Sequence, residues 1–243
     1  MTAKPDEGVG FDWFIGRAHE PKSISDENYR LGFEGRHREL NNELYSNYIA
    51  STVFNYSEPV AQNAMFDIGA GGGVLAQLLE SECAKVNLEY VMVDAEDVLK
   101  QGFKMRNKPI YGQFPTNLAD VQKSEYGEKI QYILANSVLH YVRNDGLIHP
   151  FVTSVCDLLI QGGVAYLGDV PTHEMKYAQS IANNSPANLE SANNFTWKDF
   201  ADLATLSADH GCSLYIMPQP RWVPMHPHRA DLLLIKHKPF ARW

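Results

Sequence analysis

Short apolar runs and amphipathic stretches alternate along the chain from residue 64 onward. The apolar runs are rich in β-branched and aromatic residues, as buried strands are, and they span residues 65–68, 90–93, 109–112, 130–135 and 164–167. The stretches between them have helical spacing: within residues 147–160, the side chains of Leu147, Phe151, Val155 and Leu158 share one face. This alternation predicts a parallel sheet with helices on both faces.

The end of the chain departs from that alternation. Thr196 is a suitable helix N-cap, Asp199 stands three residues later as in a capping box, and Gly211 is a suitable helix terminator. Two further strand patterns follow at residues 213–217 and 230–236, joined by a loop rich in proline and histidine. They predict a final pair of strands that closes the sheet.

A glycine-rich turn follows the first strand pattern, in Met65-Phe-Asp-Ile-Gly-Ala-Gly-Gly-Gly73. Gly69, Gly71 and Gly73 leave room for a ligand to touch the backbone, and the helical pattern after them offers unpaired N–H groups in its first turn. A strand, a glycine turn and a helix in this order predict a site for a nucleotide-like cofactor.

Two acidic residues near this turn indicate which cofactor it takes. Asp67 lies two residues before Gly69, where it would repel the pyrophosphate of a dinucleotide and attract a cation. Val74 stands where the dinucleotide pattern needs its third glycine. Asp94 follows Gly71 by 23 positions, a spacing that suits hydrogen bonds to ribose hydroxyls. S-adenosylmethionine carries an ammonium and a sulfonium but no phosphate, and so fits both acids; an NAD-dependent oxidoreductase is the alternative that Asp67 disfavours.

Asp67, Gly69, Gly71 and Gly73 form a D-x-G-x-G-x-G element, and with Asp94 they make residues 60–238 resemble a class I S-adenosylmethionine-dependent methyltransferase. This resemblance implies an α/β fold, a Rossmann-like seven-stranded methyltransferase sheet with helices on both faces and an antiparallel seventh strand. It implies S-adenosyl-L-methionine as the cofactor. The implied cofactor-binding residues are Asp67, Gly69, Ala70, Gly71, Asp94, Ala95, Gln113, Phe114, Asn136 and Ser137. The chain departs from the family at Gln113 and at Asn136-Ser137, where many members have an acid.

Several shorter stretches concern the methyl acceptor. They include Ser25-Asp-Glu-Asn-Tyr-Arg-Leu31, Gly112-Gln-Phe-Pro115, Ser137-Val-Leu-His-Tyr-Val142 and Gly168-Asp-Val-Pro171, which resemble methyltransferases of bacterial sugar and surface-polysaccharide biosynthesis. The implied reaction is methyl transfer to a hydroxyl of a sugar or sugar nucleotide, so the expected partner is a small molecule. An N- or O-methyltransferase of another small molecule and a non-catalytic cofactor-binding subunit are the alternatives.

A hydroxyl acceptor needs a general base within hydrogen-bond reach. The candidates near strand ends are His140, Asp169 and His173, with His140 first because histidine titrates near neutral pH. Each also has a structural interpretation as a hydrogen-bonding or loop-capping residue. The candidate substrate-binding residues are Tyr29, Arg30 and Tyr141.

Two segments lie outside the predicted core. Residues 1–63 contain a helical pattern with Leu40, Leu44 and Val53 on one face, and we expect an N-terminal helical cap on a methyltransferase domain of residues 64–243. Residues 170–195 follow the fifth strand, where ligands bind in open α/β sheets. They predict a lid-like insertion or, equally, a surface loop.

Composition narrows the partners. A net charge of −8 argues against a nucleic acid or an anionic membrane surface, and no apolar run is long enough to span a bilayer. The cysteines at 83, 156 and 212 are scattered and suggest reduced thiols in a cytoplasmic protein. His226 and His228 lack a third ligand at a recognisable spacing, so no metal is expected. A homo-oligomer is left open.

Overall fold

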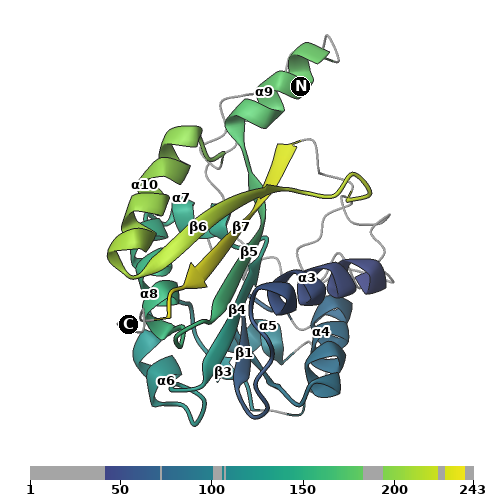
Figure 1. Ribbon diagram of the computed structural model, residues 1–243, viewed down its shortest axis with the longest axis vertical. Helices are drawn as coiled ribbons and strands as arrows, with labels where there is room; N and C mark the ends of the chain where they lie inside the picture. Colours follow the sequence, from purple (N-terminus) through teal and green to yellow (C-terminus); the bar gives the residue numbers. More distant parts are fainter. Residues whose placement is uncertain are drawn as a thin grey trace, which may run out of the picture.

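The computed structural model describes residues 42–71, 73–100, 106, 108–182, 194–223 and 228–238. Within them, seven strands form one sheet in the order β3-β2-β1-β4-β5-β7-β6 (Figure 1). The strands are β1 (Ala64–Ile68), β2 (Glu89–Asp94), β3 (Ile110–Tyr111), β4 (Ile130–Asn136), β5 (Val164–Pro171), β6 (Cys212–Pro218) and β7 (Arg229–Lys236). The first five are parallel, and β7 runs antiparallel to both β5 and β6. The predicted sheet and its antiparallel seventh strand are therefore confirmed.

Helices cover both faces of this sheet (Figure 1). One face carries α3 (Asn42–Tyr56), α4 (Val74–Lys85) and α5 (Glu96–Leu99). The other face carries α6 (Leu118–Lys123), α7 (Leu139–Asn144), α8 (Ile148–Leu158) and α10 (Trp197–Asp209). The helix α9 (His173–Ala182) projects beyond the sheet after β5. The α/β class with helices on both faces is as the alternating pattern predicted.

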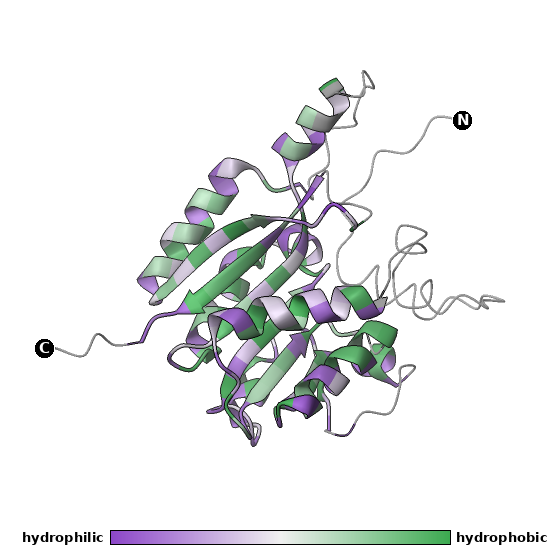
Figure 2. Cartoon of the chain, turned by 45° about the vertical axis from the view of Figure 1, so that its right-hand side comes forward, coloured by the Kyte–Doolittle hydropathy of each residue, from purple (hydrophilic) through white to green (hydrophobic). Residues whose placement is uncertain are grey.

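The strands alternate between two apolar clusters because successive side chains of a strand point to opposite faces. Phe66, for example, packs in the cluster under α8 and α10, whereas Met65 packs in the cluster under α3 and α4. Every residue of β1 is buried. Figure 2 shows hydrophobic residues along the central strands, whereas the helices carry both hydrophobic and polar residues. Burial on both faces explains why these strands are near-continuous apolar runs in the sequence.

The capping box at the start of α10 is present as predicted. Asp199 Oδ2 accepts from the Thr196 N–H at 2.7 Å, and Thr196 Oγ1 accepts from the Asp199 N–H at 3.2 Å. The helix ends at Asp209, and Gly211 follows with φ +71°. Such a backbone favours glycine, so the predicted terminator is confirmed too.

The two predicted accessory segments are described in part. α3 packs through Ile49 and Val53 in the same apolar cluster as α4 and the sheet, while residues 1–41 lie outside the described residues. After β5, which continues four residues beyond its predicted end, α9 occupies His173–Ala182, and residues 183–193 again lie outside. The cap over 1–63 and the lid over 170–195 stay predictions. In the part of the chain that the structure describes, no helix has the length and apolarity needed to cross a bilayer.

Candidate functional site

The glycine turn after β1 has the backbone that the sequence suggested. Gly69 and Gly71 have φ values of +73° and +66°, which disfavour other residues. A Cβ added to Gly69 would lie 2.5 Å from Cγ2 of Val138. α4 begins directly after its N-cap residue Gly73, which has no side chain to cap the helix. The turn therefore brings bare backbone and a helix N-terminus to the carboxyl edge of the sheet.

Asp94 ties this turn to the neighbouring strand β2. Its Oδ2 accepts from the Gly71 N–H at 2.9 Å and its Oδ1 from the Ala95 N–H at 2.7 Å. Burial raises the pKa of the Asp94 carboxyl to about 6, and the two backbone N–H groups oppose that rise. Each carboxylate oxygen accepts more than one hydrogen bond. Asp94 thus shapes the turn through both of its carboxylate oxygens.

Asp67 occupies a different environment from the one the sequence suggested. It is buried and accepts a hydrogen bond from the hydroxyl of Tyr90 on β2. Burial raises its pKa to about 7; the Tyr90 bond counteracts this rise, and the charge of Asp94 adds to it. From the sequence, this group was expected to be charged. Burial favours its neutral form more than the sequence led us to expect, and the contact with Tyr90 was not foreseen.

The residues expected to border the adenine follow β3. Gln113 donates through Nε2 to Asp145 at 3.1 Å. Phe114 is buried and meets Phe151 edge-on, with ring centroids 5.2 Å apart. Phe114 is therefore part of the apolar core, and Gln113 is the more exposed of the two.

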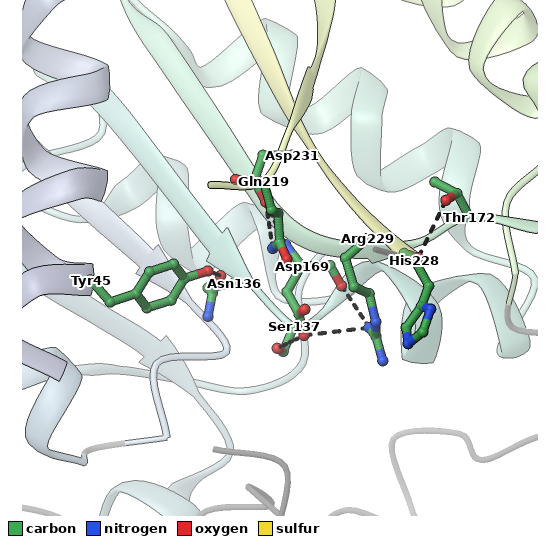
Figure 3. A network of polar contacts seen from close by, with 9 residues as sticks. All are labelled: Tyr45, Asn136, Ser137, Asp169, Thr172, Gln219, His228, Arg229 and Asp231. Carbon is green, nitrogen blue, oxygen red and sulfur yellow. Dashed lines mark hydrogen bonds and ion pairs between the residues drawn. The ribbon is translucent and has the colours of Figure 1, made fainter. Parts of the chain in front are cut away.

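Polar side chains from four elements meet at the ends of β4 and β5 (Figure 3). Ser137 Oγ donates to Asp169 Oδ2, and both residues have φ +59°. The hydroxyl of Tyr45, on α3, donates to Asn136 Oδ1 at 2.8 Å. The structure thus brings together three of the residues expected at the site, Asn136, Ser137 and Asp169, and adds Tyr45 from 91 positions away.

Two residues of β7 complete this polar cluster. Arg229 donates through Nη1 to the Asp169 carbonyl at 2.8 Å and lies 3.4 Å from its Oδ2. Asp231 Oδ1 accepts from the Asp169 N–H at 3.0 Å. Neither residue was expected at the site from the sequence. The signal was present, because Asp231 interrupts the apolar residues of this strand and Arg229 stands two positions before it.

Comparison with known proteins bears on this geometry. No family model and no curated protein matches the chain. Among solved structures, the CurJ carbon methyltransferase superposes with a TM-score of 0.57 at 13% identity, covering 88% of this chain and 61% of its own. The S-adenosylmethionine-dependent methyltransferase SibL gives 0.52 at 14% identity, covering 92% and 65%. A DUF574 family protein from Streptomyces avermitilis gives 0.54 at 12% identity, covering 92% and 95%.

The chain has the class I methyltransferase fold. It spans less than two thirds of the length of the CurJ and SibL chains. The glycine turn, Asp94 and the Asn136-Ser137-Asp169 group, all of them expected site residues, lie at the carboxyl ends of the parallel strands of this fold.

Three other expected residues, His140, Tyr141 and His173, lie on the helices that follow β4 and β5. His140 is half-buried in the first turn of α7, and its ring packs on Tyr141 with centroids 4.0 Å apart. His173 starts α9, and its N–H donates to the carbonyl of Phe195 at 2.8 Å. Tyr29 and Arg30 lie outside the described residues. Among residues that the structure does describe, no group of three His, Cys, Asp or Glu could hold a metal ion.

Proposed function

We propose that the chain is an S-adenosylmethionine-dependent methyltransferase that methylates a hydroxyl of a small molecule, with a sugar or sugar nucleotide as the acceptor class. One observation carries the cofactor half of this proposal. Asp67 and Asp94 are both buried at the ends of adjacent strands, and no ion pair joins either of them to a lysine or arginine of the described chain. Buried acids without a cationic partner favour a ligand that brings positive charge and disfavour a pyrophosphate.

The cofactor-binding roles follow from the strand ends. The turn of Gly69, Ala70 and Gly71 and the N-terminus of α4 would hold the methionine part, with Asp67 beneath them. Asp94 would accept from the ribose hydroxyls, beside Ala95. Gln113 would border the adenine, with Phe114 behind it in the apolar core. S-adenosylmethionine supplies a methyl group on a sulfonium, which is a good leaving group, so the protein has chiefly to align the acceptor and exclude water.

Asp169 is the candidate base that the polar cluster supports best. The acceptor hydroxyl loses its proton as it attacks, and a carboxylate within hydrogen-bond reach can take that proton. Asp169 lies at the end of β5 beside Asn136 and Ser137, and these three side chains offer donors and acceptors suited to hydroxyl groups. His140, first choice from the sequence, and His173 are the alternatives. Tyr141, Tyr29 and Arg30 remain proposed acceptor contacts.

The proposal extends to the accessory segments. Tyr45 reaches from α3 to Asn136 at the end of β4, which supports a cap role for residues 1–63. α9 follows Asp169 within four positions, which supports a lid role for residues 170–195. Both segments would help to exclude water from the reacting groups.

Isothermal titration with S-adenosylmethionine and with NADH tests the cofactor. We expect S-adenosylmethionine to bind and NADH not to bind. Asp94→Asn should weaken S-adenosylmethionine by about tenfold or more, because an amide offers one acceptor oxygen to two backbone N–H groups. Asp202→Asn, a matched change at an exposed position of α10, should leave binding unaltered. No binding at millimolar concentration, or tighter binding of NADH, would overturn the proposal.

The acceptor is tested by methyl transfer from radiolabelled S-adenosylmethionine. The panel consists of free sugars, nucleoside-diphosphate sugars, phenols and primary amines. We expect label in the sugar classes, with release of S-adenosylhomocysteine. Label confined to phenols or amines would replace the sugar by another acceptor while the enzyme assignment stands.

A further inference from the structure

We infer that Asp231 and Arg229 of β7 are positioning residues, which hold Asp169 so that its carboxylate faces the methyl acceptor. This inference rests on the proposed function, since it takes Asp169 as the group that meets the acceptor hydroxyl. It adds two residues that approach the site from the last strand of the sheet. Neither touches the acceptor in this scheme, because both act on the backbone or side chain of Asp169.

The backbone of Asp169 has a conformation that needs support from its surroundings. Its φ of +59° is unusual for a residue with a side chain. The β5–β7 pairing is irregular here, with a register shift between Leu167 and Val170. In an antiparallel ladder, alternate residues bond both of their backbone groups to the partner backbone. The N–H and carbonyl of Asp169 have other partners. In this protein they bond to side chains instead, and such a conformation persists only where the surroundings hold it.

Side chains of β7 bond to both the N–H and the carbonyl of Asp169 (Figure 3). Asp231 Oδ1 accepts a hydrogen bond from the Asp169 N–H at 3.0 Å, and Arg229 Nη1 donates to the Asp169 carbonyl at 2.8 Å. The carboxylate is held as well, by Ser137 Oγ and by the 3.4 Å approach of Arg229. Other side chains therefore fix the position of the Asp169 backbone and of one of its carboxylate oxygens.

Asp231 is itself held in place by hydrogen bonds from other side chains. It is 0% exposed and accepts four hydrogen bonds, two at each oxygen. Oδ1 accepts from Asp169 N and from Gln219 Nε2 at 2.9 Å. Oδ2 accepts from the hydroxyls of Tyr166 at 2.6 Å and Tyr48 at 3.2 Å. Three of these partners hold Asp231 in place, and the fourth is the backbone that it positions.

Stability alone does not explain this arrangement. A buried ion pair such as Arg229–Asp169 is often no more stabilising than apolar residues of the same volume. A non-glycine residue at positive φ adds conformational strain. What the network does provide is a single orientation of Asp169 beside Asn136 and Ser137. Accurate placement of a reacting group is worth about 100-fold in rate, and this is the benefit we assign to Asp231 and Arg229.

The deciding comparison is Asp231→Ala against Asp231→Asn. Asparagine still accepts from Asp169 N through Oδ1, and its Nδ2 can donate to the hydroxyls of Tyr166 and Tyr48 after these rotate. Alanine loses every one of these bonds. Tyr48→Phe is the matched control, because it removes a bond to Asp231 without touching Asp169.

Three measurements are made on the full chain. They are methyl transfer to the sugar and nucleoside-diphosphate-sugar panel, the Kd of S-adenosylhomocysteine, and the φ of Asp169 in crystals of the S-adenosylhomocysteine complex. Asp231→Ala should lower kcat by about 100-fold, leave the Kd within about threefold, and move Asp169 away from positive φ. Asp231→Asn and Tyr48→Phe should preserve all three values.

Several results would overturn the inference. In Asp231→Ala, these are an unchanged φ at Asp169, an unchanged kcat, or equal losses in kcat and cofactor affinity. If Asp231→Ala does not fold, Arg229→Gln is measured instead, because its shorter side chain loses the bond to the Asp169 carbonyl. An unchanged kcat in Arg229→Gln would also contradict the inference. Failure of the proposed function is a separate outcome, in which the unaltered protein binds neither S-adenosylmethionine nor S-adenosylhomocysteine.

Discussion

Asp67→Asn should stabilise the protein at alkaline pH and weaken its hold on the cofactor. Asp67 is buried, and its pKa is raised from an ordinary value of 3.8 to about 7. Asparagine has nearly the same shape and can accept the Tyr90 hydrogen bond through Oδ1, but it carries no charge. The substitution therefore removes the burial of a charge and leaves the packing close to that of the original side chain.

The sign of the effect follows from proton binding. Between pH 4 and 7 the folded chain keeps a proton on Asp67 that the unfolded chain has released, so the free energy of unfolding falls as pH rises through this window. The gap between 3.8 and about 7 corresponds to about 4 kcal/mol at pH 8, as an upper estimate. Asp67→Asn abolishes this loss, so the variant should match the parent at pH 4 and exceed it increasingly up to pH 8.

Urea unfolding at pH 4, 5, 6, 7 and 8 measures this difference, with Asp202→Asn as an exposed control. At pH 8 we expect Asp67→Asn to gain several kcal/mol and the control to stay within about 0.5 kcal/mol of the parent. A constant offset between variant and parent at every pH, or a loss at pH 8, would refute the reasoning.

The same carboxyl should link cofactor binding to proton release. A cationic ligand favours the charged form of Asp67, so S-adenosylmethionine binding at pH 6.5 should release a proton. Titration calorimetry in two buffers of different ionisation enthalpy measures the number released. Asp67→Asn should bind at least about tenfold more weakly and release fewer protons. Equal proton release in both proteins would show that another group is responsible.

Three further outcomes are expected. Gly69→Ala puts a Cβ 2.5 Å from a neighbouring methyl group at φ +73°, so it should lower the free energy of unfolding by about 1–3 kcal/mol and remove most of the cofactor affinity. Gly146→Ala is the control, because its φ is +71° but nothing lies within 4 Å of the added Cβ; it should lose only the stability that the backbone strain costs. Urea unfolding measures the stability and calorimetry measures the cofactor affinity. Thr196→Ala removes the α10 cap and should cost about 1 kcal/mol, whereas Thr205→Ala on the exposed side of that helix should not; equal losses would contradict the capping role. Tyr90→Phe removes the bond that lowers the pKa of the buried acid of β1, so the upper pH limit of its stability loss should rise in urea unfolding while the lower limit stays in place.

Local patterns determined the order and type of the elements. The apolar runs become strands because both of their faces are buried, and the capping box of Thr196 and Asp199 forms within one helical turn. The glycine turn is also local, since positive φ at Gly69 and Gly71 is a property of a few adjacent residues. For the same reason the glycine spacing could indicate a cofactor site before any tertiary contact was known.

Tertiary structure decided which polar groups meet at the site. Asp231 reaches Asp169 across 62 positions, and Tyr45 reaches Asn136 across 91. Periodicity along the chain carries no information about such pairs, because they depend on which strands become neighbours. The charge state of Asp67 could not be predicted from the sequence either. It depends on how completely the folded chain excludes water from that carboxyl, and on the hydrogen bond from the Tyr90 hydroxyl of the adjacent strand.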